Sequence, residues 1–397
     1  MRTMSPAIAA STDFLTQLAT RTLSVCAPSV EAIGATRFRR FLLGVGLTMI
    51  VGLAPSAAWG RDAAARPLAG PYADRAEALQ WADDVAQRHG LDVGWVREQL
   101  AQARFVPAVT RAIMPPPAGT AKNWAAYRAR FVEPIRIRAG LDWWASNADW
   151  LGRAQAQYGV PAEIVVAIVG IETLYGRHTG SFRVLDALAT LSFDFPTGRR
   201  DRSAFFRDEL AAFLVWSSRE GLNPGVPRGS FAGAIGLPQF MPSSILKYGI
   251  DFNGNGHVDL QRSPADVIGS VAHYLAAFGW TPGLAPVFAV DAPVDTADRA
   301  ALLGPDILPT FTPAQFAERG ARLDPAVQAT DGPLALVELQ NGDAAPSYVA
   351  GTRNFYAITR YNWSSYYAMA VIDLAETLRE RRQAGLREPP ASARTAR

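Results

Sequence analysis

Apolar residues recur at helical spacing through much of the chain. Between residues 72 and 100 the pattern predicts two amphipathic helices, separated by a break at His89-Gly90. Further helical patterns cover about 121–132, 141–158 and 364–381. The sequence therefore predicts a mainly helical chain.

The stretch PAEIVVAIVGIETLYG, residues 161–176, differs from these helices because it has no polar face. Pro161 suits the first position of a helix and Gly176 suits its C-terminal cap. A helix that is apolar on every side is a buried helix. Glu172, near the end of this stretch, is therefore a carboxylic acid in an apolar setting.

Glu172 has two interpretations. Burial and the negative end of the helix dipole both raise the pKa of a carboxyl group. A Glu that stays protonated near neutral pH is what a general acid for glycosidic cleavage requires. The alternative is a structural ion pair with Arg177 or Arg183, which also perturbs the pKa. Arguments from charge alone leave both interpretations open.

The stretch GSFAGAIGLPQFMPSS, residues 229–244, sets glycines and small residues around the polar side chains of Ser230 and Gln239. A glycine-rich backbone beside the start of a helix allows a ligand to approach closely. The alternative is a tight connection between two helices, in which the glycines only form turns.

Residues 281–349 are richer in Pro, Gly and Asp than the rest of the chain. Short apolar runs at 287–290 and 334–339 predict strands, and Thr312–Arg319 predicts a helix with Pro313 in its first turn. We therefore expect a small β-containing subdomain inserted in a helical core. The predicted fold class is α+β, predominantly α.

Composition narrows the possible functions. The 397 residues are 49% hydrophobic, which excludes a largely disordered chain. A net charge of +3 is too small for a strongly basic nucleic-acid-binding surface. One cysteine and four widely separated histidines exclude a disulfide framework and a zinc site of usual spacing. Candidate chemistry therefore rests on carboxylates.

The first 60 residues predict a secretory signal. Arg37, Arg39 and Arg40 precede the apolar run 41–53, and small residues follow it. This run is short for a membrane span, which needs about 20 residues, so an uncleaved anchor is the alternative. Cys26 lies upstream of the run, so it is not the lipidated first residue of a chain cut after it. We expect an exported, soluble protein that is not lipid-anchored.

The stretch DFNGNGHVDL, residues 251–260, matches the first half of a calcium-binding loop. Its candidate metal-ligating residues are, in order, Asp251, Asn253, Asn255, His257 through its backbone carbonyl, and Asp259. Position 12 of such a loop carries a bidentate carboxylate, but here it is Arg262. Asp266 replaces it only if the loop bulges. The sequence leaves open a weak calcium site and a metal-free turn rich in Asp and Asn.

Four motifs stand in a fixed order along the chain. They are ETLYG at 172–176, GSFAGAIGLPQFMPSS at 229–244, DFNGNGHVDL at 251–260 and NFYAITRYNWSSYYAMAV at 354–371. Together they resemble the membrane-bound lytic murein transglycosylase B family, from about residue 72 to 378. An ordered set of four is more specific than any one of them.

This resemblance implies a lysozyme-like helical core and cleavage of the β-1,4 bond between N-acetylmuramic acid and N-acetylglucosamine in peptidoglycan. The new end is a 1,6-anhydromuramic residue, and one Glu acts first as acid and then as base, with no cofactor required. By position, Glu172 is the catalytic residue, and the substrate-binding residues are Ser230, Gln239, Tyr361, Asn362 and Tyr367.

Each of the later residues also has a structural interpretation. Tyr361 and Tyr367 are suited to ordinary core packing, and Asn362 to a turn. The sequence departs from the family at Phe231, where Tyr is common, and at Leu237-Pro238, where an aromatic-glycine pair is usual. These departures alter cleft detail and leave the acid in place.

The resemblance completes the predicted organisation. We expect a targeting segment at 1–60, a helical catalytic core at 61–280 plus 350–385, the subdomain at 281–349 and a disordered tail at 386–397. The expected location is the periplasm and the expected partner is the peptidoglycan glycan strand. No motif indicates nucleic acid or other cell-wall enzymes as partners. A muramidase that uses water and a non-catalytic peptidoglycan-binding module remain the alternatives.

Overall fold

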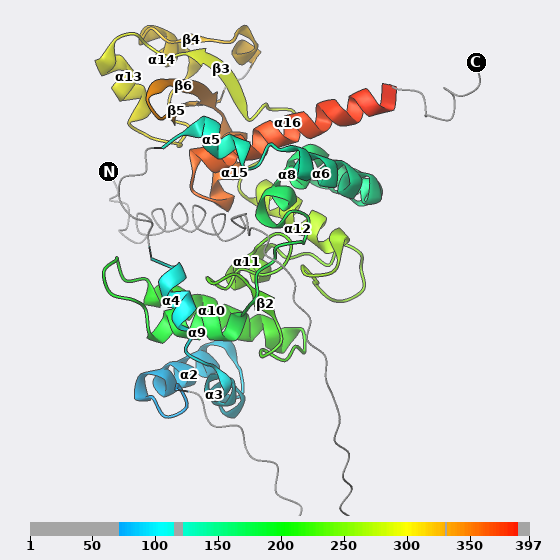
Figure 1. Cartoon of the computed structure of the whole chain (residues 1–397), viewed down its shortest axis with the longest axis vertical. Helices are drawn as coiled ribbons and strands as arrows, with labels where there is room; N and C mark the ends of the chain where they lie inside the picture. The colour runs from blue at the N-terminus through cyan, green and yellow to red at the C-terminus, as the bar shows by residue number, and fades with distance from the viewer. Residues whose placement is uncertain (1–70, 115–121, 330–331, 388–397) are drawn as a thin grey trace, which may run out of the picture.

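Residues 71–114, 122–329 and 332–387 are described by the computed structural model. The targeting segment predicted for 1–60, including Cys26, lies outside them, as does most of the predicted tail. Within the described residues helices predominate, as predicted (Figure 1).

The helices have the following bounds: α2 Ala76–His89, α3 Val93–Gln102, α4 Pro107–Ala112, α5 Trp124–Ala129, α6 Pro134–Ser146, α7 Ala148–Tyr158, α8 Ala162–Thr173, α9 Val184–Phe193, α10 Ser203–Arg219, α11 Pro242–Tyr248, α12 Pro264–Ala277, α13 Thr296–Leu303, α14 Pro313–Glu318, the 3-10 helix η2 Pro325–Ala329, α15 Arg353–Tyr361 and α16 Ser365–Arg387.

The break predicted at His89-Gly90 is confirmed, because Gly90 ends α2 in the left-handed region at φ 66°. The single helix predicted for 141–158 is wrong. Two helices, α6 and α7, meet there at Asn147, whose side-chain amide donates to the Trp143 carbonyl at 2.8 Å. A side chain that bonds the local backbone competes with the helical ladder, so the helix ends at this residue.

The helix predicted for 121–132 is also shorter than expected. Only Trp124–Ala129 forms α5, and a separate helix, α6, begins at Pro134. Proline disfavours helical backbone at the residue before it, which is Glu133, and the Glu133 carboxylate caps α6 by accepting the Arg136 amide at 2.7 Å.

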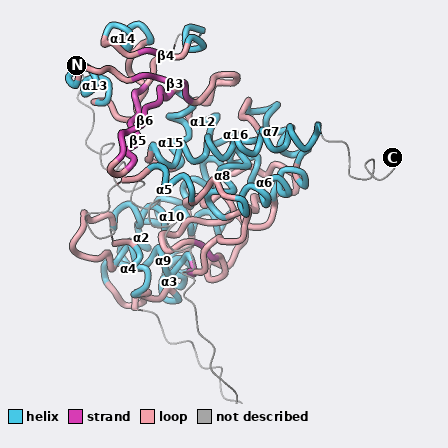
Figure 2. The backbone as a smooth tube through the Cα atoms, turned by 45° about the horizontal axis from the view of Figure 1, so that its top comes forward, coloured by secondary structure: helices cyan, strands magenta, loops and turns pink. Residues whose placement is uncertain are grey.

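The buried helix predicted from the run at 161–176 is confirmed as α8, but its predicted ends are wrong. Pro161 is the N-cap and not the first helical residue, and the C-cap is Leu174, in the left-handed region, and not Gly176. Ten of its twelve residues are buried. Helices α6, α7, α12 and α16 pack against it, and α16 lies beside α8 in both views (Figures 1 and 2). Because four helices pack against α8, it needs apolar side chains around most of its circumference.

The strands form two antiparallel sheets. Their bounds are β1 Phe182–Arg183, β2 Arg228–Gly229, β3 Val287–Asp291, β4 Arg322–Leu323, β5 Ala335–Asn341 and β6 Ala344–Gly351. β1 pairs with β2, and the larger sheet has the order β4-β3-β6-β5. In the register of the β5–β6 hairpin, Leu336 faces Ala350 and Leu339 faces Ser347.

The larger sheet confirms the inserted β-containing subdomain of the predicted fold class. The strands predicted at 287–290 and 334–339 are β3 and β5, and the predicted helix at 312–319 is α14, which Thr312 caps. The sheet covers its own small apolar cluster, which includes Leu302, Phe316 and Leu336. In Figures 1 and 2 it lies with α13 and α14 at one end of the molecule. The boundaries at 281 and 349 remain a proposal.

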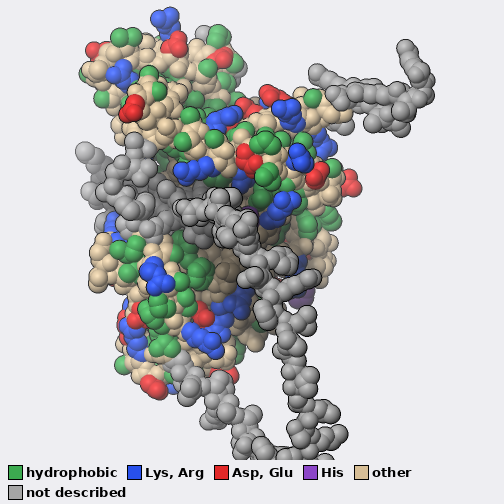
Figure 3. Space-filling view, in the orientation of Figure 1, with side chains coloured by type: hydrophobic (Ala, Val, Ile, Leu, Met, Phe, Trp, Pro, Cys, Tyr) green, Lys and Arg blue, Asp and Glu red, His purple; other side chains and the backbone are tan. Residues whose placement is uncertain are grey.

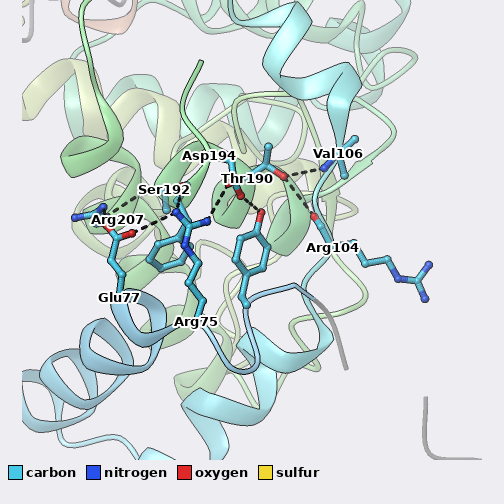
Figure 4. Close-up of polar contacts among 10 residues, drawn as sticks. Arg75, Glu77, Arg104, Val106, Thr190, Ser192, Asp194 and Arg207 are labelled. Carbon is cyan, nitrogen blue, oxygen red and sulfur yellow. Dashed lines mark hydrogen bonds and ion pairs between the residues drawn. The ribbon is translucent and has the colours of Figure 1, made fainter. Parts of the chain in front are cut away.

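At the other end, polar contacts attach α2 to α9 and α10 (Figure 4). Arg75 donates to the Asp194 carboxylate at 2.9 Å and to the Phe193 carbonyl at 2.6 Å. Arg207 bonds the Ser192 carbonyl at 3.1 Å and also pairs with the Glu77 carboxylate. These arginines cap the C-terminal end of α9, where carbonyl groups lack helical partners.

Charged side chains of both signs are interspersed on the face drawn in Figure 3, as the small net charge leads one to expect. Across the described residues, no single helix is both long and apolar enough to cross a bilayer. The pair α7 and α8 meets those criteria only jointly, with a bend of 116° between the two helices.

A tyrosine following α8 locks this helix to α6. The Tyr175 ring fits a slot formed by Gly170 of α8 and Gly140 of α6. A Cβ atom added at Gly170 would lie 2.4 Å from the Tyr175 hydroxyl oxygen, and one added at Gly140 would lie 2.3 Å from it. Both glycines are therefore required by close approach of the ring, at helix positions where glycine otherwise costs stability.

We predict that Gly170→Ala destabilises the protein by about 1–3 kcal/mol, because the added methyl overlaps the buried ring. The matched control is Gly152→Ala in α7, where an added Cβ meets nothing within 4 Å. That change should stabilise the protein by about 0.5–1 kcal/mol through helix propensity. Urea unfolding measures the free energy of unfolding of both variants. Equal free energies would show that Tyr175 does not need a glycine at position 170.

Candidate active site

Glu172 is the penultimate residue of α8 and is held by a constrained turn. Leu174 and Tyr175 follow the helix in the left-handed region, at φ 50° and 58°, although neither is glycine. The Thr173 hydroxyl donates to the Leu237 carbonyl at 2.9 Å, which ties the turn to the glycine-rich loop. Such backbone strain persists only where the surrounding structure enforces it.

The environment of Glu172 favours its neutral form. Burial raises the pKa of this carboxyl from 4.5 to about 7, and the hydrogen bond from Tyr367 opposes that rise. The Tyr367 hydroxyl donates to Glu172 Oε1 at 2.6 Å. The structure does not support the alternative of a structural ion pair at Glu172. Arg183 pairs with Asp186, and Arg177 is exposed and forms no ion pair with Glu172.

The Ser230 and Gln239 side chains lie in the glycine-rich loop, which the β1–β2 pair joins to the segment after α8. The Ser230 hydroxyl oxygen accepts the Ala234 amide at 3.0 Å, so its own proton is free to donate to a ligand. Gln239 Nε2 donates to the Thr179 and Gly236 carbonyls at 3.1 and 2.8 Å, which leaves Oε1 as an acceptor.

The corner between α15 and α16 supplies the remaining predicted residues. The half-buried Tyr361 donates its hydroxyl to the Pro238 carbonyl at 2.6 Å. Its ring lies nearly parallel to that of Tyr367, with centroids 6.3 Å apart. Asn362 is 8% exposed, and its Oδ1 accepts no hydrogen bond from the described residues. A buried acceptor without a partner calls for a ligand or water.

All six predicted side chains line one cavity of about 190 Å³, although they come from three separate segments, namely the end of α8, the glycine-rich loop and the corner between α15 and α16. They are Glu172, Ser230, Gln239, Tyr361, Asn362 and Tyr367. At the positions that depart from the family motif, Leu237 and Pro238 accept hydrogen bonds through their backbone carbonyls, and Phe231 is buried.

Sequence reasoning missed Glu209, Met241, Ser243 and Ser244, which line the same cavity. The sequence does indicate that Glu209 is a buried carboxylate, because it directly precedes the apolar stretch LAAFLVW of α10. Glu172 has a similar apolar setting in α8. The last three belong to or directly precede α11, and only the fold turns them toward Glu172.

The Asp251 loop is closed by its own backbone. The Asp251 carboxylate accepts the amides of Gly254, Asn255 and Gly256 at 2.7–3.0 Å, and these bonds hold the pKa of this carboxyl below its usual range. Asn253 and Asn255 accept amides two residues ahead, and Asp259 accepts those of Gln261 and Arg262.

Asp266 is not available as a substitute metal ligand. It is fully buried, and its two oxygens accept the amides of Phe252, Asn253 and Asp259. In the part of the chain that the structure describes, no group of three or more His, Cys, Asp or Glu side chains forms a metal site. The loop therefore offers a cation mostly neutral oxygens.

The comparisons with known proteins show the family of this chain. Residues 74–376 match the family described as the transglycosylase SLT domain. The membrane-bound lytic murein transglycosylase B of Escherichia coli K12 is 38% identical over 320 residues, which cover 78% of this chain and 85% of that protein.

Solved structures show the same relationship. Catenated SltB1 of Pseudomonas aeruginosa has a TM-score of 0.71 at 37% identity, covering 78% of this chain and 99% of that one. E. coli Slt35 in complex with calcium has a TM-score of 0.68 at 36% identity (79% and 96%). P. aeruginosa SltB3 in complex with NAG-anhNAM-pentapeptide has a TM-score of 0.64 at 32% identity (76% and 79%). This chain therefore belongs to the lytic transglycosylase family that is defined by the transglycosylase SLT domain.

Proposed function

We propose that this protein is a lytic murein transglycosylase that cleaves the β-1,4 bond between N-acetylmuramic acid and N-acetylglucosamine. The observation that carries the proposal is a single Glu with a pKa near 7, held at the end of a buried helix in a cavity lined by hydroxyl and amide groups. The family relationship supports the same activity.

Glu172 performs both proton transfers in this mechanism. Protonated near neutral pH, it donates its proton to the glycosidic oxygen as the bond to C1 breaks. The resulting carboxylate then removes the proton of the C6 hydroxyl, which attacks C1 and closes the 1,6-anhydro ring. Burial raises the pKa of Tyr367, so this phenol stays protonated and steadies the carboxylate between the two steps.

The polar groups around Glu172 orient the sugar. The Ser230 hydroxyl donates to the substrate, while Gln239 Oε1 and the unpartnered Asn362 Oδ1 accept its N–H or O–H groups. The parallel rings of Tyr361 and Tyr367 form an apolar wall. This division of donors and acceptors fits an acetamido sugar, and the protonated Glu172 beside it favours an enzyme over a non-catalytic binding module.

The hydrolytic alternative receives less support. Most glycosidases that use water employ two carboxylates that both face the sugar. The second carboxylate of this cavity, Glu209, already accepts two hydrogen bonds from Ser243. A single working acid is sufficient when the substrate's own C6 hydroxyl is the nucleophile.

We expect Glu172→Gln to abolish release of muropeptides from purified sacculi, because the amide transfers no proton. The wild type should release products lighter by one water than reducing muropeptides, as read by mass spectrometry. Glu163→Gln in the first turn of the same helix is the matched control and should keep its activity. Products with reducing ends would instead identify a muramidase, and full activity of Glu172→Gln would overturn the acid assignment.

The pH profile tests the role of Glu172 as a proton donor. Because Glu172 must be protonated to act, activity should fall about tenfold per pH unit above about pH 7. The Tyr367 hydrogen bond favours the charged form, so Tyr367→Phe should raise the pKa of Glu172 and move this limb to higher pH. Plots of kcat/KM against pH for the wild type and for Tyr367→Phe measure the fall in activity and its shift. A limb that stays in place or moves to lower pH would contradict the assignment.

The Asp251 loop binds calcium weakly in this proposal. The side chains of Asp251, Asn253, Asn255 and Asp259 and the His257 carbonyl provide the oxygens, and the calcium complex of the related Slt35 supports the assignment. With Arg262 at position 12, the affinity falls in the weak range of extracellular modules, about 0.1–1 mM. The chemistry at Glu172 requires no metal.

Free calcium at about ten times that dissociation constant should raise the free energy of unfolding by about 1.4 kcal/mol, which is measured as a rise in Tm. Asp251→Asn combined with Asp259→Asn should abolish this rise, while Asp343→Asn, an exposed hairpin position, should retain it. Magnesium serves as the ion control. An identical rise in the wild type and in both variants would show that calcium binds elsewhere.

Export and location rest on the sequence. The segment 1–60 has the order of a secretory signal, which directs the protein to the periplasm, where its glycan-strand substrate lies. The position of Cys26 upstream of the apolar run argues against lipid attachment after that run.

A further inference from the structure

Glu209 is a buried carboxylate that the proposed mechanism does not use. It lies in the middle of α10, is 4% exposed and lines the same cavity as Glu172. A carboxylate at such a position is costly to bury unless its oxygens are hydrogen-bonded. Its partners therefore indicate what it does.

Both partners of Glu209 belong to one residue at the start of α11. The Ser243 amide donates to Oε2 at 2.9 Å, and the Ser243 hydroxyl donates to Oε1 at 2.7 Å. The residue that precedes this helix, Met241, has no side-chain acceptor for the free amides of the first turn. Glu209, distant in sequence, supplies the missing cap from another helix.

The first turn of α11 is part of the cavity wall. Met241, Ser243 and Ser244 line the cavity, and the turn directly continues the loop that carries Gln239. The two ends of that loop are joined by paired backbone bonds between Ile235 and Phe240, at 2.8 and 3.1 Å. The bonds to Glu209 therefore fix where this wall stands relative to Glu172.

We propose that Glu209 is a positioning residue for glycan binding, which holds the wall formed by Met241, Ser243 and Ser244 through its two bonds to Ser243. This inference rests on the proposed function, because the bound polymer is its substrate. Glu209 acts through hydrogen-bond geometry and not through its charge. Glutamine satisfies the same geometry, since its Oε1 accepts the Ser243 amide and its Nε2 donates to the Ser243 hydroxyl.

Steady-state kinetics on peptidoglycan separate this role from catalysis. Glu209→Ala leaves the Ser243 amide unpaired and should raise KM about tenfold, with kcat within about threefold of the wild type. Glu209→Gln should match the wild type in KM and in its pH profile. Asp208→Ala, the exposed neighbour on α10, is the matched control and should change neither constant.

Three results would overturn the proposal. If Glu209→Gln loses kcat as severely as Glu209→Ala, the carboxylate takes part in the chemistry. If Glu209→Ala lowers kcat and leaves KM unchanged, or behaves as the wild type, the wall does not depend on it. Should Glu209→Ala fail to fold in circular dichroism, Ser243→Ala decides, because it removes one of the two bonds and should raise KM about threefold.

A binding measurement keeps this inference separate from the proposed function. Glycan affinity is compared between Glu172→Gln and the double variant Glu172→Gln with Glu209→Ala, neither of which turns over substrate. About tenfold weaker binding of the double variant supports the role of Glu209 whatever product the wild type makes. Equal affinities overturn it, whereas a wild type that makes no anhydro product overturns only the proposed function.

Discussion

The burial of α8 is the constraint on which the rest of the structure depends. Ten of its twelve residues are buried, and the four helices α6, α7, α12 and α16 pack against it. Glu172 sits at the end of this helix, so its carboxyl group is brought into an apolar setting by the packing of residues that have no chemical role. The same packing raises its pKa to about 7 and makes it a proton donor near neutral pH.

The turn after α8 shows how closely the site depends on its surroundings. Tyr175 occupies its slot only because Gly140 and Gly170 lack side chains, and the ring in turn holds a left-handed backbone beside Glu172. Thr173 joins this turn to the glycine-rich loop, and Tyr361 joins that loop to α15. The acid and the groups that orient the sugar are thus parts of one hydrogen-bonded unit.

Two carboxylates in one cavity have different roles because their partners differ. Glu172 accepts one hydrogen bond from Tyr367 and remains available to a substrate. Glu209 accepts an amide and a hydroxyl from Ser243 and is occupied with holding a helix. Residue type and burial alone do not distinguish them, and the neighbouring donors do.

By itself, the sequence determined the helical class, the buried α8, the strands β3 and β5 and the residues of the ordered motifs. These follow from local hydrophobic periodicity and from residue identity, which each segment carries alone. The break at Asn147 was not predicted, because it depends on a local side-chain hydrogen bond. The strand β6 was not predicted either, because it contains Pro346 and lacks regular alternation of apolar and polar residues. Asn341-Gly342, however, is typical of a hairpin turn before it. Only the tertiary structure decided that Glu172 pairs with Tyr367 and not with Arg183, that Asp266 is buried away from a metal, and that Glu209 caps α11. Each of these joins or separates residues far apart in the chain, and no local pattern encodes which distant donor meets a buried carboxylate.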